Sequence, residues 1–154
     1  MDKSENSITK NAEETQKLGE ELAHRLTQKG SVTLPYVICL YGDLGMGKTT
    51  FVQGFAKGLG ITSRLLSPTF IIVRRQYLMP IDRFFFHLDL YRLTSEQSIQ
   101  ELGIQEIFDN EKNIVIVEWA ERLGDLLPEK RIDIRFTLGG TESERRIEIT
   151  YGTN

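Results

Sequence analysis

Residues 42–49 read G-D-L-G-M-G-K-T, which is the pattern G-x-x-x-x-G-K-[ST] of a phosphate-binding loop. An apolar run at residues 36–41 enters the loop, and apolar side chains at helical spacing follow it as far as Gly58 and Gly60. The glycines let backbone N–H groups curl around phosphates, and the helix behind them directs its positive dipole end at the anion. A strand, a glycine-rich loop and a helix in this order therefore predict a site for a nucleoside triphosphate.

The loop pattern also assigns roles to individual side chains. In loops of this kind the lysine, here Lys48, reaches the β and γ phosphates, and the hydroxyl of Thr49 binds Mg²⁺. The expected ligands are therefore Mg²⁺ and ATP, with ADP as the product. Adenine is favoured over guanine because no N-K-x-D segment, the guanine-reading pattern, follows the loop. The residues expected to contact the nucleotide are Leu44, Gly45, Met46, Gly47, Lys48, Thr49 and Thr50.

Length and charge limit the remaining possibilities. The 154 residues are enough for one domain, expected over residues 1–154, that buries about two thirds of its unfolded surface. The net charge of −3 argues against a chain that coats nucleic acid, so any RNA contact is expected to be local or made by a partner. The single cysteine, Cys39, excludes a disulfide framework and a cysteine-based metal site. Because no apolar segment approaches the roughly 20 residues that span a bilayer, and residues 1–10 are polar, we expect a cytoplasmic protein without membrane contact.

Hydrophobic periodicity predicts a mixed sheet. Asn11 with Glu14 marks one helix start, whose apolar spacing continues to Gly30, and Thr94 with Gln97 marks another. The expected strands are residues 36–41, 71–78, 84–91, 113–118, 132–138 and 147–151. The third of these is expected to be central because neither of its faces is mainly polar, and the last two alternate as a hairpin with one wet face. The predicted fold class is α/β, a P-loop NTPase-like mixed β-sheet with helices on both faces and an antiparallel C-terminal hairpin.

Two acidic residues accompany the apolar strands. Glu118 ends the run I-V-I-V, where this fold class places the acid near the metal of a bound triphosphate, although aspartate is more familiar there. The alternative is a solvated glutamate at a strand end. Asp89 lies inside an apolar strand, where a lone carboxylate is costly, and a magnesium-bound water, Lys48 or Arg92 would compensate its charge. Asp89 would then orient or deprotonate the attacking water, unless it is a structural partner of Arg92 or a strand-end cap.

Three further residues keep two interpretations each. Thr69, held by Pro68, either binds Mg²⁺ or the γ phosphate as a switch threonine, or begins a strand after a plain turn. His87 shares a strand face with Asp89 and is interpreted as a hydrogen-bonded core histidine rather than a functional group. Trp119 either packs in the core or contacts a partner. The candidate catalytic residues are Asp89, Lys48, Glu118 and Thr69, and the candidate metal ligands are Thr49 and Glu118.

The chain resembles the TsaE (YjeE) family of small bacterial ATPases in four ordered segments, G-D-L-G-M-G-K-T-T, S-P-T-F, H-L-D-L-Y-R-L and I-V-I-V-E-W-A-E-R-L. The likeness extends from T-Q-K-L-G-E-E-L-A in the first helix to the last hairpin. It implies a part in making threonylcarbamoyladenosine on tRNA, as an accessory ATPase and not as the transferase. It also implies binding to a heterodimer of TsaD and TsaB, which nucleotide turnover resets between catalytic rounds.

The resemblance carries residue roles with it. The implied roles are phosphate and Mg²⁺ binding for Lys48 and Thr49, Mg²⁺ binding for Glu118, support of hydrolysis for Asp89, and a switch-like segment for Thr69. Met46 departs from the family, which often has alanine there, but the N–H of this residue matters more than its side chain. The first helix and the final hairpin are the expected walls of the adenine pocket.

Two other function classes use the same loop. A nucleotide-gated binding module would use ATP to fix a shape for a partner without required turnover. A small-molecule kinase would need an acceptor pocket and a lid bearing arginines, whereas Arg74, Arg75 and Arg83 fall in or beside expected strands. Because no arginine is assigned to the γ phosphate, and an arginine finger contributes about 10³ to 10⁵ in rate, we expect slow hydrolysis that partner binding changes.

Overall fold

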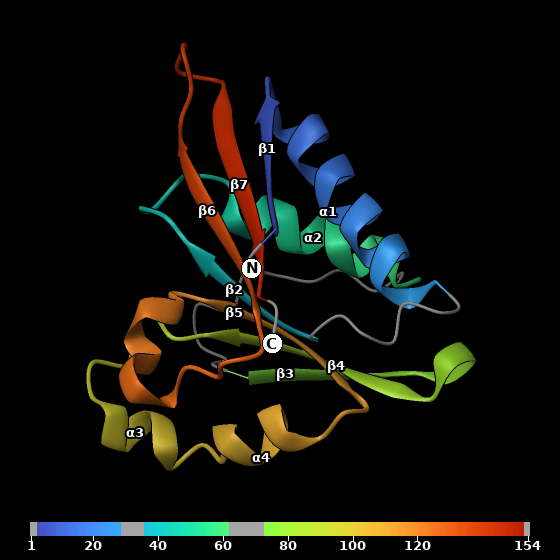
Figure 1. The fold of residues 1–154 in the computed structure, drawn as a ribbon, viewed down its shortest axis with the longest axis vertical. Helices are drawn as coiled ribbons and strands as arrows, with labels where there is room; N and C mark the ends of the chain where they lie inside the picture. Colours follow the sequence, from blue (N-terminus) through green and yellow to red (C-terminus); the bar gives the residue numbers. More distant parts are fainter. Residues whose placement is uncertain (1–2, 29–35, 62–72, 153–154) are drawn as a thin grey trace.

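The computed structural model describes residues 3–28, 36–61 and 73–152 (Figure 1). Within these residues, seven strands form one mixed sheet in the order β1-β7-β6-β2-β5-β4-β3. The strands are β1 (Lys3–Thr9), β2 (Val37–Tyr41), β3 (Val73–Leu78), β4 (Arg83–Asp89), β5 (Asn113–Glu118), β6 (Ile132–Leu138) and β7 (Arg145–Tyr151). The helices are α1 (Ala12–Thr27), α2 (Lys48–Gly58), α3 (Glu96–Gln100) and α4 (Ile104–Asp109), with 3-10 helices η1 (Met79–Ile81) and η2 (Ala120–Leu126).

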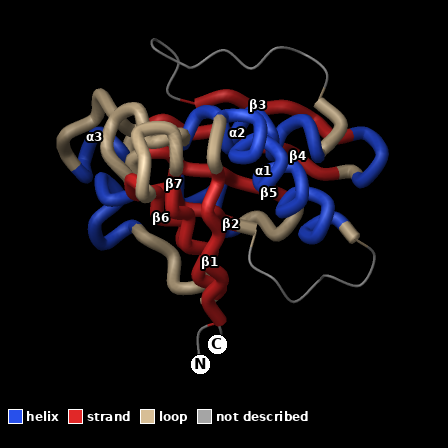
Figure 2. Tube along the Cα trace, turned by 90° about the horizontal axis from the view of Figure 1, so that it is seen from above, coloured by secondary structure: helices blue, strands red, loops and turns tan. Residues whose placement is uncertain are grey.

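Strands run parallel at the centre of the sheet and antiparallel toward both sides. The neighbours β6, β2, β5 and β4 pair in parallel, whereas β1 with β7, β7 with β6, and β3 with β4 pair antiparallel. Figure 2 shows the sheet extending from β3 on one side to β1 on the other. The carboxyl ends of β2, β4 and β5 meet at one edge, which is where ligands bind in open sheets of this kind.

Helices cover both faces of the sheet, as the sequence predicts (Figure 1). Along β2, Ile38 and Leu40 join the buried cluster made with α1 and α2, while Val37 and Cys39 join the cluster made with α3, α4 and η2. This alternation is the period of two that a strand imposes on its side chains. Within the described residues, none of these helices has both the length and the apolar character needed to cross a bilayer.

Glycines let α1 and α2 approach each other closely. A Cβ atom added at Gly54 would lie 1.9 Å from the carbonyl oxygen of Gln16, and one at Gly19 would lie 2.3 Å from that of Phe51. Both separations are far inside van der Waals contact, so a larger residue would force the helices apart. This packing brings the start of α1 to residues 42–47, the predicted phosphate-binding loop, which is called the phosphate loop below. The same arrangement sets Thr15 beside Gly47.

The two predicted capping boxes have different outcomes. The first is confirmed, since the side chain of Asn11 accepts the N–H of Glu14 at 2.9 Å. The second is displaced by one residue, because Ser95 and not Thr94 caps α3 by accepting the N–H of Ser98. Both candidates carry a hydroxyl that suits a helix start, so local sequence does not choose between them.

The sequence predicts that strand β4 is central, and this prediction is wrong. The strand lies second from the edge of the sheet, between β5 and β3. It also ends at Asp89, two residues before the predicted end of the run. Aromatic contacts account for its apolar character: Phe85 contacts Phe55 of α2, and Phe84 contacts Tyr77 of β3. A strand next to the edge can therefore have the sequence pattern of a central strand when large aromatic rings cover both of its faces.

Helix α1 is shorter than predicted. It ends at Thr27, before the predicted stop at Gly30.

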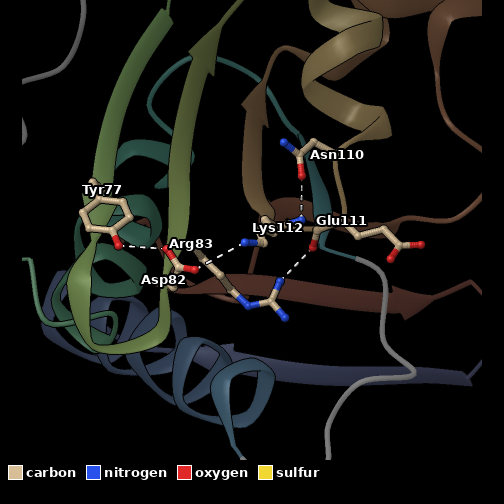
Figure 3. Close-up of polar contacts among 6 residues, drawn as sticks. All are labelled: Tyr77, Asp82, Arg83, Asn110, Glu111 and Lys112. Carbon is tan, nitrogen blue, oxygen red and sulfur yellow. Dashed lines mark hydrogen bonds and ion pairs between the residues drawn. The ribbon is translucent and has the colours of Figure 1, made fainter.

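The β3–β4 hairpin is tied to the turn before β5 by polar contacts (Figure 3). Asp82 accepts the hydroxyl of Tyr77 at 2.8 Å and the ammonium of Lys112 at 3.3 Å, and these bonds lower the pKa of its carboxyl. Arg83 donates to the carbonyl oxygen of Glu111 at 2.7 Å. All these contacts lie at the amino ends of β4 and β5, so they fix the hairpin at the edge opposite the phosphate loop.

Candidate functional site

The phosphate loop joins the end of β2 to the start of α2, as the sequence predicts. Gly45 has a φ of +82° and Gly47 a φ of +100°, both in the left-handed region that favours glycine. Gly47 is also the N-cap residue of α2, and it offers no side-chain cap to the first N–H groups of the helix. Uncapped N–H groups at the positive end of a helix dipole form a ready site for an anion.

Lys48, the first residue of α2, folds back over the loop. Its ammonium group donates to the carbonyl oxygen of Gly42 and lies 3.6 Å from the centre of the Trp119 ring. The residue is 5% exposed, and burial lowers its pKa, while nearby carboxylates, with Glu118 foremost, oppose that shift. Trp119 therefore packs against the loop lysine, which makes it part of the candidate site.

Thr49, Glu118 and His87 form a chain of contacts across α2, β5 and β4 that is buried at Glu118 and His87. The hydroxyl of Thr49 donates to Oε1 of Glu118 at 3.0 Å, and Oε2 of Glu118 lies 2.6 Å from Nε2 of His87. Glu118 is 2% exposed and His87 1% exposed. Glu118 stands beside Leu40 in the parallel β2–β5 pair, so the strand order carries the acid to the loop. It is thus a buried, partnered residue rather than a solvated strand end.

Asp89 lies opposite Glu118 in the parallel β4–β5 pair. It is the last residue of β4 rather than an interior one, and its Oδ1 accepts the N–H of Tyr91 at 3.0 Å. The pKa of the Asp89 carboxyl is raised, mainly by burial and also by the nearby charge of Glu118. The hydrogen bond from Tyr91 and the charge of Lys48 oppose this shift. The strand-end cap is therefore present, and the charges of Glu118 and Lys48 still act on the carboxylate.

A hollow of about 130 Å³ opens beside the loop. Arg145 of β7 spans its rim by donating to the carbonyl oxygen of Gly45 at 3.3 Å. The first turn of α1 and the loop between β6 and β7 complete the walls, so segments from both ends of the chain meet here. The lining residues are Asn11, Ala12, Thr15, Gly45, Gly47, Thr50, Ser143 and Arg145.

The structure brings most of the predicted site residues to one edge of the sheet. Lys48, Thr49, Glu118 and Asp89 converge there, and Thr50 lines the hollow. Two of the predicted loop residues differ in burial. Leu44 is 73% exposed, whereas Met46 packs against the buried cluster made with α1 and α2. Thr69 lies outside the described residues.

Residues that the sequence reasoning did not assign to the site are His87, as the partner of Glu118, and Arg145, as a wall of the hollow. His87 is predicted to share a strand face with Asp89, but its partner Glu118 lies on the neighbouring strand β5, and no local pattern marks that contact. Arg145 lies 100 residues from Gly45 in sequence, and no local pattern marks it.

Comparison with known proteins places the chain in a family. The sequence model of the family described as "Threonylcarbamoyl adenosine biosynthesis protein TsaE" matches residues 9–147 of the chain. A tRNA threonylcarbamoyladenosine biosynthesis protein TsaE from Bacillus subtilis is 40% identical over 116 residues, which cover 74% of this chain and 68% of that protein. A protein of the same name from Synechocystis is 42% identical over 117 residues, covering 73% and 68% of the two chains.

The fold has a counterpart among solved structures. The crystal structure of YdiB from Bacillus subtilis matches with a TM-score of 0.77 and 33% sequence identity, covering 100% of this chain and 89% of that one. This likeness confirms the predicted α/β fold class.

Proposed function

This chain belongs to the TsaE family, and we propose that it is a magnesium-dependent ATP-binding protein and slow ATPase that supports threonylcarbamoyladenosine formation on tRNA. In this proposal it is an accessory ATP hydrolase that acts on a TsaD–TsaB heterodimer in the cytoplasm. It meets tRNA only indirectly or through a local contact. The names of the relatives support the pathway, and the geometry of the loop supports the nucleotide.

The contact between Thr49 and Glu118 is the observation that carries the proposal. A hydroxyl and a carboxylate are oxygen ligands of the kind Mg²⁺ takes, and here they touch at 3.0 Å beside the uncapped end of α2. Within residues 3–28, 36–61 and 73–152, no group of three or more His, Cys, Asp and Glu side chains is arranged to hold a metal. That suits magnesium in a triphosphate site, because the ion keeps waters and phosphate oxygens alongside one or two protein ligands.

Bound magnesium would supply positive charge to the β and γ phosphates. The protein side chains then have separate tasks. Lys48 leaves the carbonyl oxygen of Gly42, a neutral acceptor, for phosphate oxygens, which bind an ammonium group more strongly. Asp89 orients the attacking water and accepts its proton, a task for which a raised pKa is suited.

The hollow supports a position for the adenosine part of the ligand. It adjoins Gly45 and Gly47, so a nucleotide whose phosphates occupy the loop has its sugar and base directed into this space. Asn11 and Ser143 offer polar atoms at its wall, and Arg145 adds a positive charge. The volume of about 130 Å³ and its open side fit a partly exposed base.

Reconstitution of the tRNA modification with TsaD and TsaB tests the proposal. The wild-type chain should support repeated rounds, and Lys48→Ala should abolish both nucleotide binding and that support. Asp89→Ala should keep ATP binding while hydrolysis and modification yield fall together. A normal yield with a hydrolysis-dead Asp89→Ala variant would favour the nucleotide-gated binding module. Calorimetry that finds no uptake of ATP or ADP with magnesium present would overturn the proposal, and a preference for GTP would overturn its choice of nucleotide.

A further inference from the structure

His87 makes a polar contact with Glu118 that a residue which only fills space in the core would not need. It pairs with Ile116 in the parallel β4–β5 register, so it lies on the same sheet face as Glu118, one diagonal step away. Its Nε2 atom is 2.6 Å from Oε2 of the glutamate, and both side chains are buried. A short polar contact between buried groups fixes the geometry of both, because breaking it leaves each without its partner.

The contact calls for a proton on Nε2 of the imidazole ring. With the proton on Nδ1, the lone pairs of Nε2 and of the carboxylate would face each other at 2.6 Å, and an N–H would be buried without an acceptor among the described residues. With the proton on Nε2, the ring donates to Glu118 and only the Nδ1 acceptor stays unpaired among those residues. Orphaned buried N–H groups are the rarer defect in proteins, so the second form is favoured.

We propose that His87 is a positioning residue for Glu118: its Nε2–H holds one carboxylate oxygen and thereby directs the other, Oε1, at Thr49 and the magnesium position. Glu118 links His87 to Thr49, because Oε2 contacts the ring and Oε1 accepts the hydroxyl of Thr49. The inference rests on the proposed magnesium-dependent nucleotide site. It adds a residue that reaches the metal through another side chain.

Substitutions at His87 separate positioning from packing. Gln places an amide N–H donor near the position of Nε2, Asn reaches only as far as Nδ1, and Leu fills space without any donor. The measurements are ADP affinity in EDTA and the magnesium concentration that half-saturates the gain in affinity. His87→Gln should resemble the wild type, whereas His87→Asn and His87→Leu should need about 10 to 100 times more magnesium. Affinity in EDTA should change less than about threefold in all three.

A neighbouring buried residue gives the matched control. Leu88 is buried but belongs to the cluster on the other face of the sheet, so Leu88→Val perturbs the same strand without touching Glu118. It should lower the melting temperature and leave the magnesium requirement unchanged. If Leu88→Val shifts the requirement as much as His87→Leu does, or if His87→Leu keeps the wild-type value, the positioning role is overturned.

A spectroscopic readout tests the hydrogen bond without any nucleotide. The sequence has two histidines, so His24→Gln leaves the His87 ring as the single imidazole in a ¹H–¹⁵N spectrum of the full chain. The spectrum should show a proton on Nε2, and a ring protonated at Nδ1 alone would overturn the inference. A wild-type chain that binds no nucleotide would overturn the proposed function instead, and this spectrum would still report on the His87–Glu118 contact.

Discussion

Asp89 combines a raised pKa with a position beside Glu118, and this makes its effect on stability depend on pH. The folded chain holds the Asp89 proton more tightly than the unfolded chain, whose carboxyl titrates near 3.8, so the ionised form opposes folding at neutral pH. Asn keeps an oxygen for the N–H of Tyr91 and removes the charge. Asp89→Asn should therefore melt at a higher temperature than the wild type at pH 7. The difference should shrink as the pH falls through the raised pKa and vanish below 3.8.

The same substitution should lower the rate of ATP hydrolysis. Loss of a general base lowers the rate by about 10² to 10⁴, so hydrolysis by Asp89→Asn should fall at least about 100-fold while ATP affinity changes little. Melting curves across pH and a phosphate-release assay measure the two effects on one preparation. A variant that is no more stable at pH 7, or that hydrolyses ATP at the wild-type rate, would show that the charge of Asp89 is not used in this way.

The position of a site residue could be predicted where local sequence determines it, and could not be predicted where it depends on how the strands are arranged. Lys48 and Thr49 follow from the spelling of the loop, and the position of Glu118 follows from a short apolar run that ends in an acid. His87 reads as a core histidine because the sequence does not reveal that β4 lies against β5 in a register that sets it beside Glu118. Its burial is predicted correctly, but its partner depends on strand order.

At the level of elements, β7 and the phosphate loop are coupled through Arg145. This side chain donates to the carbonyl oxygens of Glu142 and Glu144, which shapes the hairpin loop, and also to that of Gly45. Arg145→Ala should release the hairpin from the loop and remove a positive charge from the wall of the hollow. ADP binding should weaken about tenfold, as expected for the loss of one charge-assisted contact with the ligand of roughly 1.5 kcal/mol.

The next residue along β7 supplies the control for this prediction. Arg146 is exposed and points to the opposite face of the strand, so Arg146→Ala removes the same charge and should change ADP affinity less than about twofold. Fluorescence or calorimetric titration with ADP compares the two variants. Equal weakening by both would mean that net charge, and not the contact with Gly45, governs affinity.

Two elements, β1 and η2, could not be predicted because neither has a hydrophobic period in its sequence. Strand β1, K-S-E-N-S-I-T, is polar and lies at the edge of the sheet, where pairing with β7 supplies its backbone hydrogen bonds and its side chains need not be apolar. Helix η2 begins after Trp119, whose φ of +60° turns the chain out of β5. Neither feature leaves a hydrophobic period in the sequence. By contrast, α1, α2, β5 and the β6–β7 hairpin bury regular apolar patterns and are predicted, although α1 ends at Thr27, before the predicted stop at Gly30.

In the molecule as a whole, the described residues that the proposed function uses gather at one edge of one sheet. Segments from the first helix to the last strand meet at the hollow, and α2 joins them through its packing on α1. A ligand bound there contacts the beginning, the middle and the end of the chain together. Its binding should therefore stabilise the folded state as a unit rather than one loop.

Thermal denaturation with ligand checks this at the scale of the whole molecule. ADP with magnesium at about 100 times its dissociation constant adds about 2.7 kcal/mol to the free energy of unfolding, which corresponds to a rise of about 5–10 °C in melting temperature for a chain of this size. Magnesium alone should give less than about 1 °C, because the carboxylate and hydroxyl ligands of the site hold the ion only with phosphate oxygens. Lys48→Ala should remove the rise with ADP, and Arg146→Ala should retain it. If calorimetry detects binding but ADP with magnesium leaves the melting temperature of the wild-type chain unchanged, the unfolded chain must bind the ligand equally well, and the site would not depend on this junction.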